Sequence, residues 1–206
     1  MFPLNYSTVV DPLLRDVRVC VAELSGMKAD DRILDVCCGT GDQVFHYAKK
    51  GMIATGVDQN PIMINLAEAN QKRHGFNDVT FCLAPANQLP FPDGYFDAAS
   101  ISLGLHEMKR EKRDSAISEM KRVVKLGGIM IFTDFRVPLP RNPAAYLIKA
   151  VEFLVGKDNR RNFKDYLEQG GLSVILKHNQ LVVQKEVVLK LRLLLAARAT
   201  NPLIIA

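Results

Sequence analysis

The sequence predicts one α/β domain built on a doubly wound, mostly parallel seven-stranded sheet with helices on both faces. Apolar runs of strand length alternate with helix-like segments as far as residue 135, which is typical of parallel sheets. A glycine turn at Gly39 and Gly41 joins the first run to a helix. Two more apolar runs follow residue 180 and predict one antiparallel strand near the sheet edge. The 206 residues suit a single domain over 1–206.

The first elements are a covering helix over about 7–25 and a strand over 33–36. Apolar residues recur at intervals of three and four through the helix, and Gly26 is a plausible stop. The helix after the glycine turn carries one apolar stripe. It is expected to end at 49–51, where two lysines and a glycine suit a helix C-terminus.

The next elements are strands over 53–57 and 79–83 with a helix between them. Asn60 suits the N-cap of this helix and Pro61 its first position. Ile62, Met63, Leu66 and Ala67 are expected to face inward on the same helix. Both strand segments are apolar and of strand length, so they extend the parallel sheet.

The central elements are a strand over 95–103, an amphipathic helix over 109–124 and a strand over 129–135. The segment Leu126-Gly127-Gly128 is expected to end the helix. Because the last of these strands is continuously apolar, it is predicted to be buried on both faces.

The C-terminal third begins with a proline-rich loop over 136–143 and an inserted helical segment over about 143–169. The apolar helix over 144–155 is interpreted as one wall of an apolar substrate pocket, with core packing as the alternative. The remaining predicted elements are helical turns over 160–168 and 172–177 and strands over 181–188 and 189–197.

The glycine turn indicates the kind of ligand. A dinucleotide fingerprint would have its third glycine at position 44, which is Val44. Asp42 begins the helix, and a carboxylate there would repel a phosphate. Asp35, at the end of the first strand, would instead attract an ammonium or sulfonium group. S-adenosylmethionine carries both groups.

The segment Leu34-Asp35-x-x-Cys38-Gly39-Thr40-Gly41-Asp42 resembles the first motif of class I S-adenosylmethionine-dependent methyltransferases. The resemblance is strongest to the branch that contains the ubiquinone/menaquinone biosynthesis C-methyltransferases. The order of the later motifs supports it over nearly the whole chain. It implies the class I methyltransferase fold, S-adenosylmethionine as cofactor and S-adenosylhomocysteine as product.

Asp58 ends the second strand seventeen positions after Gly41. A carboxylate there can accept both ribose hydroxyls, and helix capping is the alternative role. The resemblance aligns the loop over 84–91 with the family's adenine-contacting loop and places Met63 level with the adenine. The expected cofactor-binding residues are Asp35, Cys37, Gly39, Gly41, Asp58, Gln59, Met63, Pro85, Ala86, Asn87 and Leu103, and no metal site is expected.

Two positions depart from the family pattern. Cys37 stands where many members have glycine and close relatives have alanine, so its sulfur narrows the space for the cofactor. Pro85 stands where the family usually has an aspartate that binds the adenine amino group. Proline supplies neither a carboxylate nor a backbone donor. We expect the Asn87 oxygen, a backbone carbonyl or water to take that amino group, with apolar contacts from Ile62, Met63 and Leu103.

His106 is the candidate catalytic residue. It follows the fourth strand at the carboxyl edge of the sheet, where ligands gather in open α/β folds. Histidine titrates near neutral pH, which suits removal of a proton from a phenol or enol acceptor. A purely structural histidine is the alternative.

Composition restricts the protein's class and surroundings. The net charge is +5, but the basic residues are interleaved with acids, which favours a solvated surface over nucleic-acid binding. The four cysteines lack zinc-site spacing. No apolar run reaches about 18 residues, and no signal-peptide pattern begins the chain. We therefore expect a protein of the reducing cytoplasm.

Three functions remain open at this stage. The first is methyl transfer from S-adenosylmethionine to a small, largely apolar or quinone-like acceptor. The second is a cofactor-binding partner or regulator with little catalysis, which Pro85 keeps open. The third is an NAD-dependent oxidoreductase, disfavoured by Asp42 and Val44. An apolar acceptor would allow contact with a membrane surface, and a homodimer is also allowed.

Overall fold

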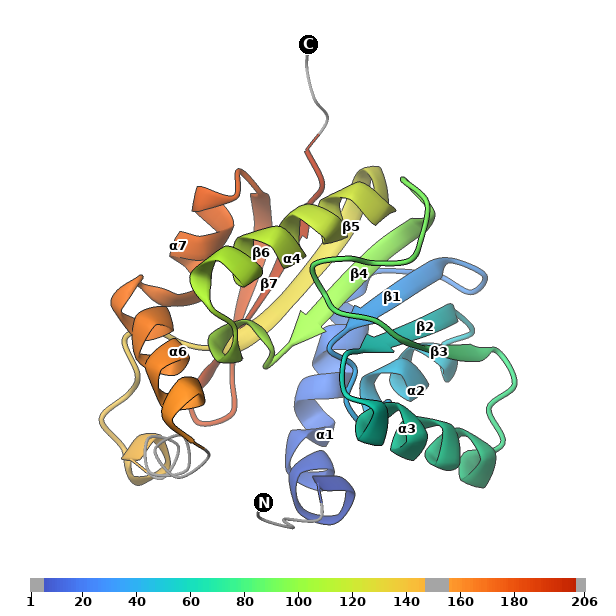
Figure 1. Cartoon of the computed structure of the whole chain (residues 1–206), viewed down its shortest axis with the longest axis horizontal. Coiled ribbons are helices and arrows are strands. Elements are labelled where there is room, and N and C mark those ends of the chain that lie inside the picture. The colour runs from blue at the N-terminus through green and yellow to red at the C-terminus, as the bar shows by residue number, and fades with distance from the viewer. Residues whose placement is uncertain (1–5, 147–155, 203–206) are drawn as a thin grey trace.

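The computed structural model describes residues 6–146 and 156–202, with side chains described from residue 14 on. Seven strands form one sheet in the order β3-β2-β1-β4-β5-β7-β6 (Figure 1). All neighbours are parallel except β7, which is antiparallel to both β5 and β6. The predicted doubly wound sheet with one antiparallel strand next to its edge is therefore confirmed. The strands are β1 (Arg32–Val36), β2 (Ile53–Asp58), β3 (Val79–Leu83), β4 (Phe96–Ser102), β5 (Val124–Phe135), β6 (Val182–Leu189) and β7 (Leu194–Thr200).

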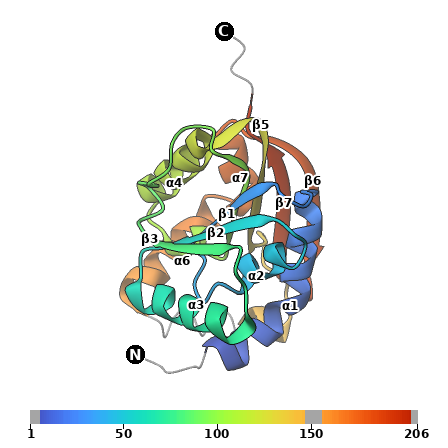
Figure 2. The same cartoon turned by 90° about the vertical axis from the view of Figure 1, so that its right-hand side faces the viewer.

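Helices cover both faces of the sheet (Figure 2). Helices α1 and α2 lie on one face, and α4 and α7 lie on the other. The helices are α1 (Tyr6–Ser25), α2 (Asp42–Ala48), α3 (Pro61–His74), α4 (Arg110–Val123), α6 (Lys157–Glu168) and α7 (Gly171–His178), with a 3₁₀ turn η1 (Leu105–Glu107) after β4.

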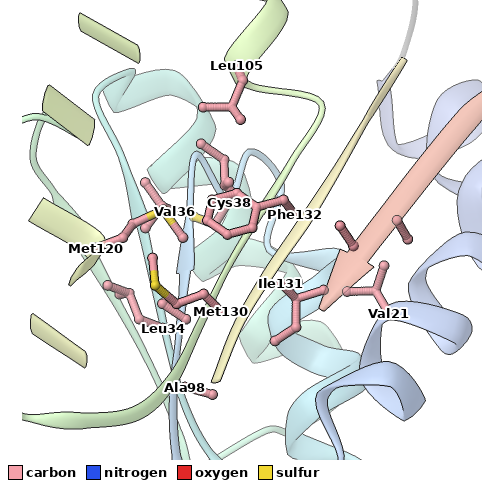
Figure 3. Packing of buried hydrophobic residues seen from close by; sticks show 14 of the residues in the cluster. Val21, Leu34, Val36, Cys38, Ala98, Leu105, Met120, Met130, Ile131 and Phe132 are labelled. Carbon is pink, nitrogen blue, oxygen red and sulfur yellow. The ribbon is translucent and has the colours of Figure 1, made fainter. Parts of the chain in front are cut away.

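The core lies on both sides of the central strands. On β5, Ile131 points toward Val21 of α1, whereas Met130 and Phe132 point to the opposite side, which Met120 of α4 covers (Figure 3). Each of these side chains is buried. This two-sided burial explains why residues 129–132 of β5 are continuously apolar instead of alternating.

Helix α3 begins as its sequence predicts and buries Ala67 as expected, but two other residues expected inside are exposed. The Asn60 side chain accepts the backbone N–H of Ile62 at 3.0 Å, and Pro61 occupies the first turn. Ile62 and Leu66 are 59% and 42% exposed. Ile64 is buried together with Ala67. The expectation that Ile62 and Leu66 pack inward was therefore wrong.

The junction between α4 and β5 differs from the sequence prediction. The helix ends at Val123 and the strand begins at Val124, so the glycines expected to end the helix lie within β5. The Asn201 amide donates to the carbonyl oxygens of Lys121 and Val124 at 2.8 and 2.9 Å. A side chain 77 residues beyond Val124 thus supplies hydrogen bonds to backbone carbonyl groups at the end of the helix.

The turn between the last two strands also differs. Residues Lys190, Leu191 and Arg192 all have positive φ angles and form a turn, although the sequence predicts a strand from residue 189. The turn contains no glycine, proline or asparagine, so no local pattern indicates it. The predicted wall helix over 144–155 lies mostly outside the described residues.

Candidate active site

A cavity of about 480 Å³ opens at the carboxyl ends of β1, β2, β4 and β5. The side of the cavity where the sequence predicts the cofactor is lined by the glycine turn, Asp58 and Met63. The opposite side, called the acceptor side below, is lined by residues of α1, η1 and the N-terminal parts of α4 and α6. Of the predicted cofactor residues, those lining this cavity are Cys37, Gly39, Asp58, Gln59, Met63 and Leu103. The structure therefore brings residues from four strands to one edge, as expected for this fold.

Asp58 fixes the shape of the glycine turn. Its Oδ2 accepts the backbone N–H of Gly39 at 3.0 Å, and its Oδ1 accepts that of Asn60 at 2.9 Å. Gly39 has φ +52°, and a Cβ at this position would have no atom within 4 Å. Gly41 is different, because its Cβ would lie 2.6 Å from the Phe81 ring. Gly39 therefore leaves open space toward the cavity, whereas Gly41 admits a packed phenylalanine.

A smaller cleft adjoins the main cavity near β2 and β3. Ala86 and Asn87 line this cleft alone. The residues that line both spaces are Cys37, Asp58, Gln59, Met108 and Lys112. This cleft is where the sequence predicts the adenine. Pro85 does not line either cavity and makes a turn in which its carbonyl accepts the backbone N–H of Gln88 at 3.0 Å.

Two residues in left-handed conformation flank the cofactor region. Cys37 has φ 58° and Leu103 has φ 57°. A Cβ on Gly104 would lie 3.2 Å from the Cys37 Cβ, so these two segments are in close contact. Burial raises the pKa of the Cys37 and Cys38 thiols, with nearby carboxylates adding to the effect. Both cysteines are therefore neutral thiols at pH 7 rather than nucleophilic thiolates.

Asp35 lies beneath the cavity rather than on its surface. It is 3% exposed, and its Oδ1 accepts the Ser100 hydroxyl at 2.6 Å. Burial raises the pKa of the Asp35 carboxyl to about 7, against the opposing effects of Ser100 and Arg18. The expectation that Asp35 contacts an ammonium stays a prediction.

His106 of η1 is held by Asp134 of β5. Its Nδ1 lies 2.7 Å from Asp134 Oδ1, and its ring makes edge contacts with Phe135, Phe163 and Tyr166. The residue is 3% exposed, but Glu107, which follows it directly, lines the cavity. His106 thus lies behind the cavity wall, and its catalytic role stays a prediction.

Several residues that line the acceptor side belong to no sequence motif, so sequence analysis did not predict them. Leu14 and Val17 of α1 form an apolar surface with Met108, whereas Lys109 and Lys112 at the N-terminus of α4 form a basic one. The fully buried Arg113 holds this wall. It donates to the carbonyl oxygens of Leu105 and Met108 at 3.0 Å each, and it contacts Asp165 on α6 and Gln169 directly after that helix.

Across residues 6–146 and 156–202, no group of three or more His, Cys, Asp or Glu side chains could hold a metal ion. Within the same ranges, no helix is both long and apolar enough to cross a membrane.

Comparison with known sequences identifies the family. Residues 33–128 match the model of a methyltransferase domain. An uncharacterized methyltransferase of Synechocystis sp. is 32% identical over 155 residues, which cover 71% of this chain and 69% of that protein. The ubiquinone/menaquinone biosynthesis C-methyltransferase UbiE of Geobacter sp. is 36% identical over 118 residues, which cover 55% of this chain. The match covers 49% of that UbiE protein, so the chain spans about half its length.

Solved structures share the fold over nearly the whole chain. A methyltransferase from Aquifex aeolicus described as SAM-dependent superposes with a TM-score of 0.72 at 18% identity, covering 98% of this chain and 99% of that one. The PH0226 protein of Pyrococcus horikoshii gives a TM-score of 0.73 at 16% identity, covering 97% and 99%. With the sequence matches and the cavity beside the glycine turn, these likenesses lead to one conclusion: the chain belongs to the class I S-adenosylmethionine-dependent methyltransferase family.

Proposed function

We propose that this protein transfers the methyl group of S-adenosylmethionine to a small, quinone-like acceptor with a phenol or enol at its reacting centre. The observation that carries the proposal is the continuous cavity, which runs from the Asp58–Gly39 hydrogen bond to an apolar surface on α1 and Met108. The similarity to ubiquinone/menaquinone C-methyltransferases supports a ring acceptor.

The reaction depends on alignment of the acceptor with the methyl group more than on covalent catalysis by the protein. The cofactor supplies a methyl group that its sulfonium already activates, so the protein has to orient the acceptor and exclude water. In this proposal Asp58 accepts the ribose hydroxyls and the neighbouring cleft at Ala86 and Asn87 takes the adenine. Leu14, Val17 and Met108 pack against the acceptor ring.

A phenol or enol acceptor must lose a proton for its carbon or oxygen to attack. His106 is the proposed base or orienting group, with Asp134 fixing its ring through Nδ1. Because the His106 ring lies behind the wall at Glu107, this role requires proton transfer through an intervening group or a small movement of η1.

The experiment has two stages. Thermal-shift titrations with S-adenosylmethionine, S-adenosylhomocysteine and NAD come first. A ligand at a hundred times its dissociation constant stabilises the fold by about 2.7 kcal/mol. The first two compounds should stabilise the protein and NAD should not. Stabilisation by NAD alone would overturn the proposal.

Turnover is the second stage. The protein with S-adenosylmethionine is incubated with a metabolite extract and with demethylated benzoquinols and naphthoquinols, and S-adenosylhomocysteine formation is measured. Product formed only with a ring acceptor supports the proposal. Tight cofactor binding with no product from any of these would favour a binding protein instead.

A further inference from the structure

Two lysine side chains line the acceptor side of the main cavity at the start of α4. Lys109 is the N-cap residue of the helix, and Lys112 follows three residues later in its first turn. Side chains with this spacing lie close together at a helix N-terminus, which is the geometry that a capping box uses. Neither ammonium group has an ion pair or a hydrogen bond within the described part of the chain. Two positive charges therefore border the cavity at the same place.

The other charges on the acceptor side leave an excess of positive charge. Arg18 of α1 is paired with Asp42, with 2.6 Å between Nε and Oδ2. Among the described residues that line this side, Glu107 is the only carboxylate, so the two lysines outnumber it by one charge. The cofactor of the proposed function brings a sulfonium into the same cavity, which adds to the positive potential. A cavity with this potential attracts an anion.

The basic surface adjoins an apolar one. Leu14, Val17 and Met108 line the same cavity as the lysines. Because this space of about 480 Å³ also has to hold the cofactor, one small acceptor must contact both surfaces. The apolar surface suits an aromatic ring, and the lysines suit an anionic substituent on that ring. One charge in excess matches a carboxylate, whereas a phosphate monoester carries about 1.5 to 2 negative charges at pH 7.

Thr133 on β5 is independent evidence that this part of the cavity binds polar groups. Its Oγ1 is buried without a hydrogen-bond partner among the described residues, and the residue is 1% exposed and lines the cavity. In the strand order of the sheet, β5 lies three places from β2, which carries Asp58. Buried hydroxyl groups are nearly always hydrogen-bonded. Since this hydroxyl can donate and accept, a phenol or carbonyl oxygen of the acceptor suits it.

We propose that the acceptor is an aromatic hydroxy acid whose carboxylate binds Lys109 and Lys112. Its ring packs against the apolar surface of α1 and Met108. This inference rests on the proposed function and names the charge class of its acceptor. Both lysines are exposed, so solvent screens the two ion pairs and each contributes modestly. Together they should favour a ring acid over a neutral ring of the same shape by about tenfold.

The test uses gentisate, a benzoquinol that carries one carboxylate, and gentisamide, its neutral amide. Calorimetry on the protein saturated with S-adenosylhomocysteine should show about tenfold tighter binding of gentisate, and added salt should reduce the difference. Lys109→Met/Lys112→Met should make the two dissociation constants equal. Lys50→Met/Lys72→Met is the matched control, because it removes two lysines that line neither the cavity nor the adjoining cleft, and it should keep the preference.

The remaining variants and outcomes separate this inference from the proposed function. Lys109→Gln/Lys112→Gln replaces the methionine variant if that protein does not fold. Because Lys112 also lines the cleft predicted for the adenine, S-adenosylhomocysteine affinity is measured for each variant and only the ratio of the two ring compounds is compared.

Equal binding of gentisate and gentisamide to the wild type overturns the inference while the proposed function stands. A preference that survives in a folded variant without both lysines has the same meaning. If S-adenosylhomocysteine binds but neither ring compound does, the quinol-like acceptor of the proposed function fails, and this inference fails with it.

Discussion

Asp134 holds His106 with both of its carboxylate oxygens. Oδ1 lies 2.7 Å from the ring Nδ1, and Oδ2 accepts the His106 backbone N–H at 3.1 Å. Because Asp134 also accepts the backbone N–H groups of His106 and Phe135, its oxygens act as acceptors, and this arrangement favours the tautomer with the ring proton on Nδ1 and Nε2 as the basic nitrogen. Asp134 therefore fixes both the position of the residue and the tautomer of its ring.

From this geometry, His106→Ala should lower turnover by about a hundredfold and leave S-adenosylhomocysteine affinity unchanged. Turnover on an identified acceptor and calorimetric affinity are the two measurements. His178→Ala, in the last turn of α7, is the control for loss of a histidine. Near wild-type turnover in a folded His106→Ala protein would make the residue purely structural.

Asp58→Ala should weaken S-adenosylhomocysteine binding by about 1 to 3 kcal/mol, because hydrogen bonds to a charged acceptor are lost. The variant also removes the acceptor of the Gly39 N–H, so the turn itself loosens. Asp78→Ala, in the loop before β3, serves as the control. Equal calorimetric affinity in a folded Asp58→Ala protein would remove Asp58 from the cofactor site.

Gly39→Ala should reduce cofactor affinity more than it reduces stability. Its added methyl meets no protein atom within 4 Å, so the cost to folding is the left-handed φ alone, about 1 kcal/mol. The same methyl takes space that the cofactor needs. Gly75→Ala has a similar φ and also meets no atom within 4 Å, but it lies at the end of α3. Chemical denaturation should show similar losses for both variants, and calorimetry should show weak binding only for Gly39→Ala. Equal affinities in the two would contradict the assignment of Gly39.

Asp35 should make stability depend on pH. Burial raises the folded-state pKa of the Asp35 carboxyl to about 7, from its usual value of 3.8. The folded state therefore binds the extra proton, and stability falls as pH rises between those two values. Relative to Asp35→Asn, the wild type should lose up to about 4 kcal/mol of unfolding free energy between pH 4 and pH 8. Urea denaturation of both proteins at several pH values measures this difference. Parallel pH profiles would mean that the carboxyl is not perturbed.

Because of Pro85, the protein should discriminate only weakly between adenine and an analogue that lacks the amino group. The wild type should prefer S-adenosylhomocysteine over its analogue without the adenine amino group by no more than the value of one neutral hydrogen bond, about 0.5 to 1.5 kcal/mol. Pro85→Asp should increase that preference. If the wild type already prefers the amino compound a hundredfold, about 2.7 kcal/mol, another residue has taken over the missing role.

The sequence predicts those features well whose residues lie close together along the chain. The glycine turn, Asp58 and the Asn60–Pro61 helix start are each encoded within a few residues, and the structure contains each of them. The parallel sheet follows from the alternation of apolar runs.

The remaining features depend on partners that are distant in sequence. Asn201 ends α4, Arg113 ties η1 to α6, and Arg18 orients Gln43. No periodicity or spacing marks such pairs, because tertiary packing alone brings them together. The turn at 190–193 was missed for a different reason, since its residues are ordinary helix or strand formers in an unusual conformation.

The position of β7 between β5 and β6 has a consequence for how the chain folds. The neighbour that completes β5 begins at Leu194, some sixty residues after β5 ends, and Asn201 closes α4 only after that. The centre of the sheet therefore depends on a contact of high sequence separation, which carries a large loop-closure entropy and forms slowly. During synthesis, one hydrogen-bonding edge of β5 stays open until β7 has left the ribosome, and an open strand edge favours aggregation.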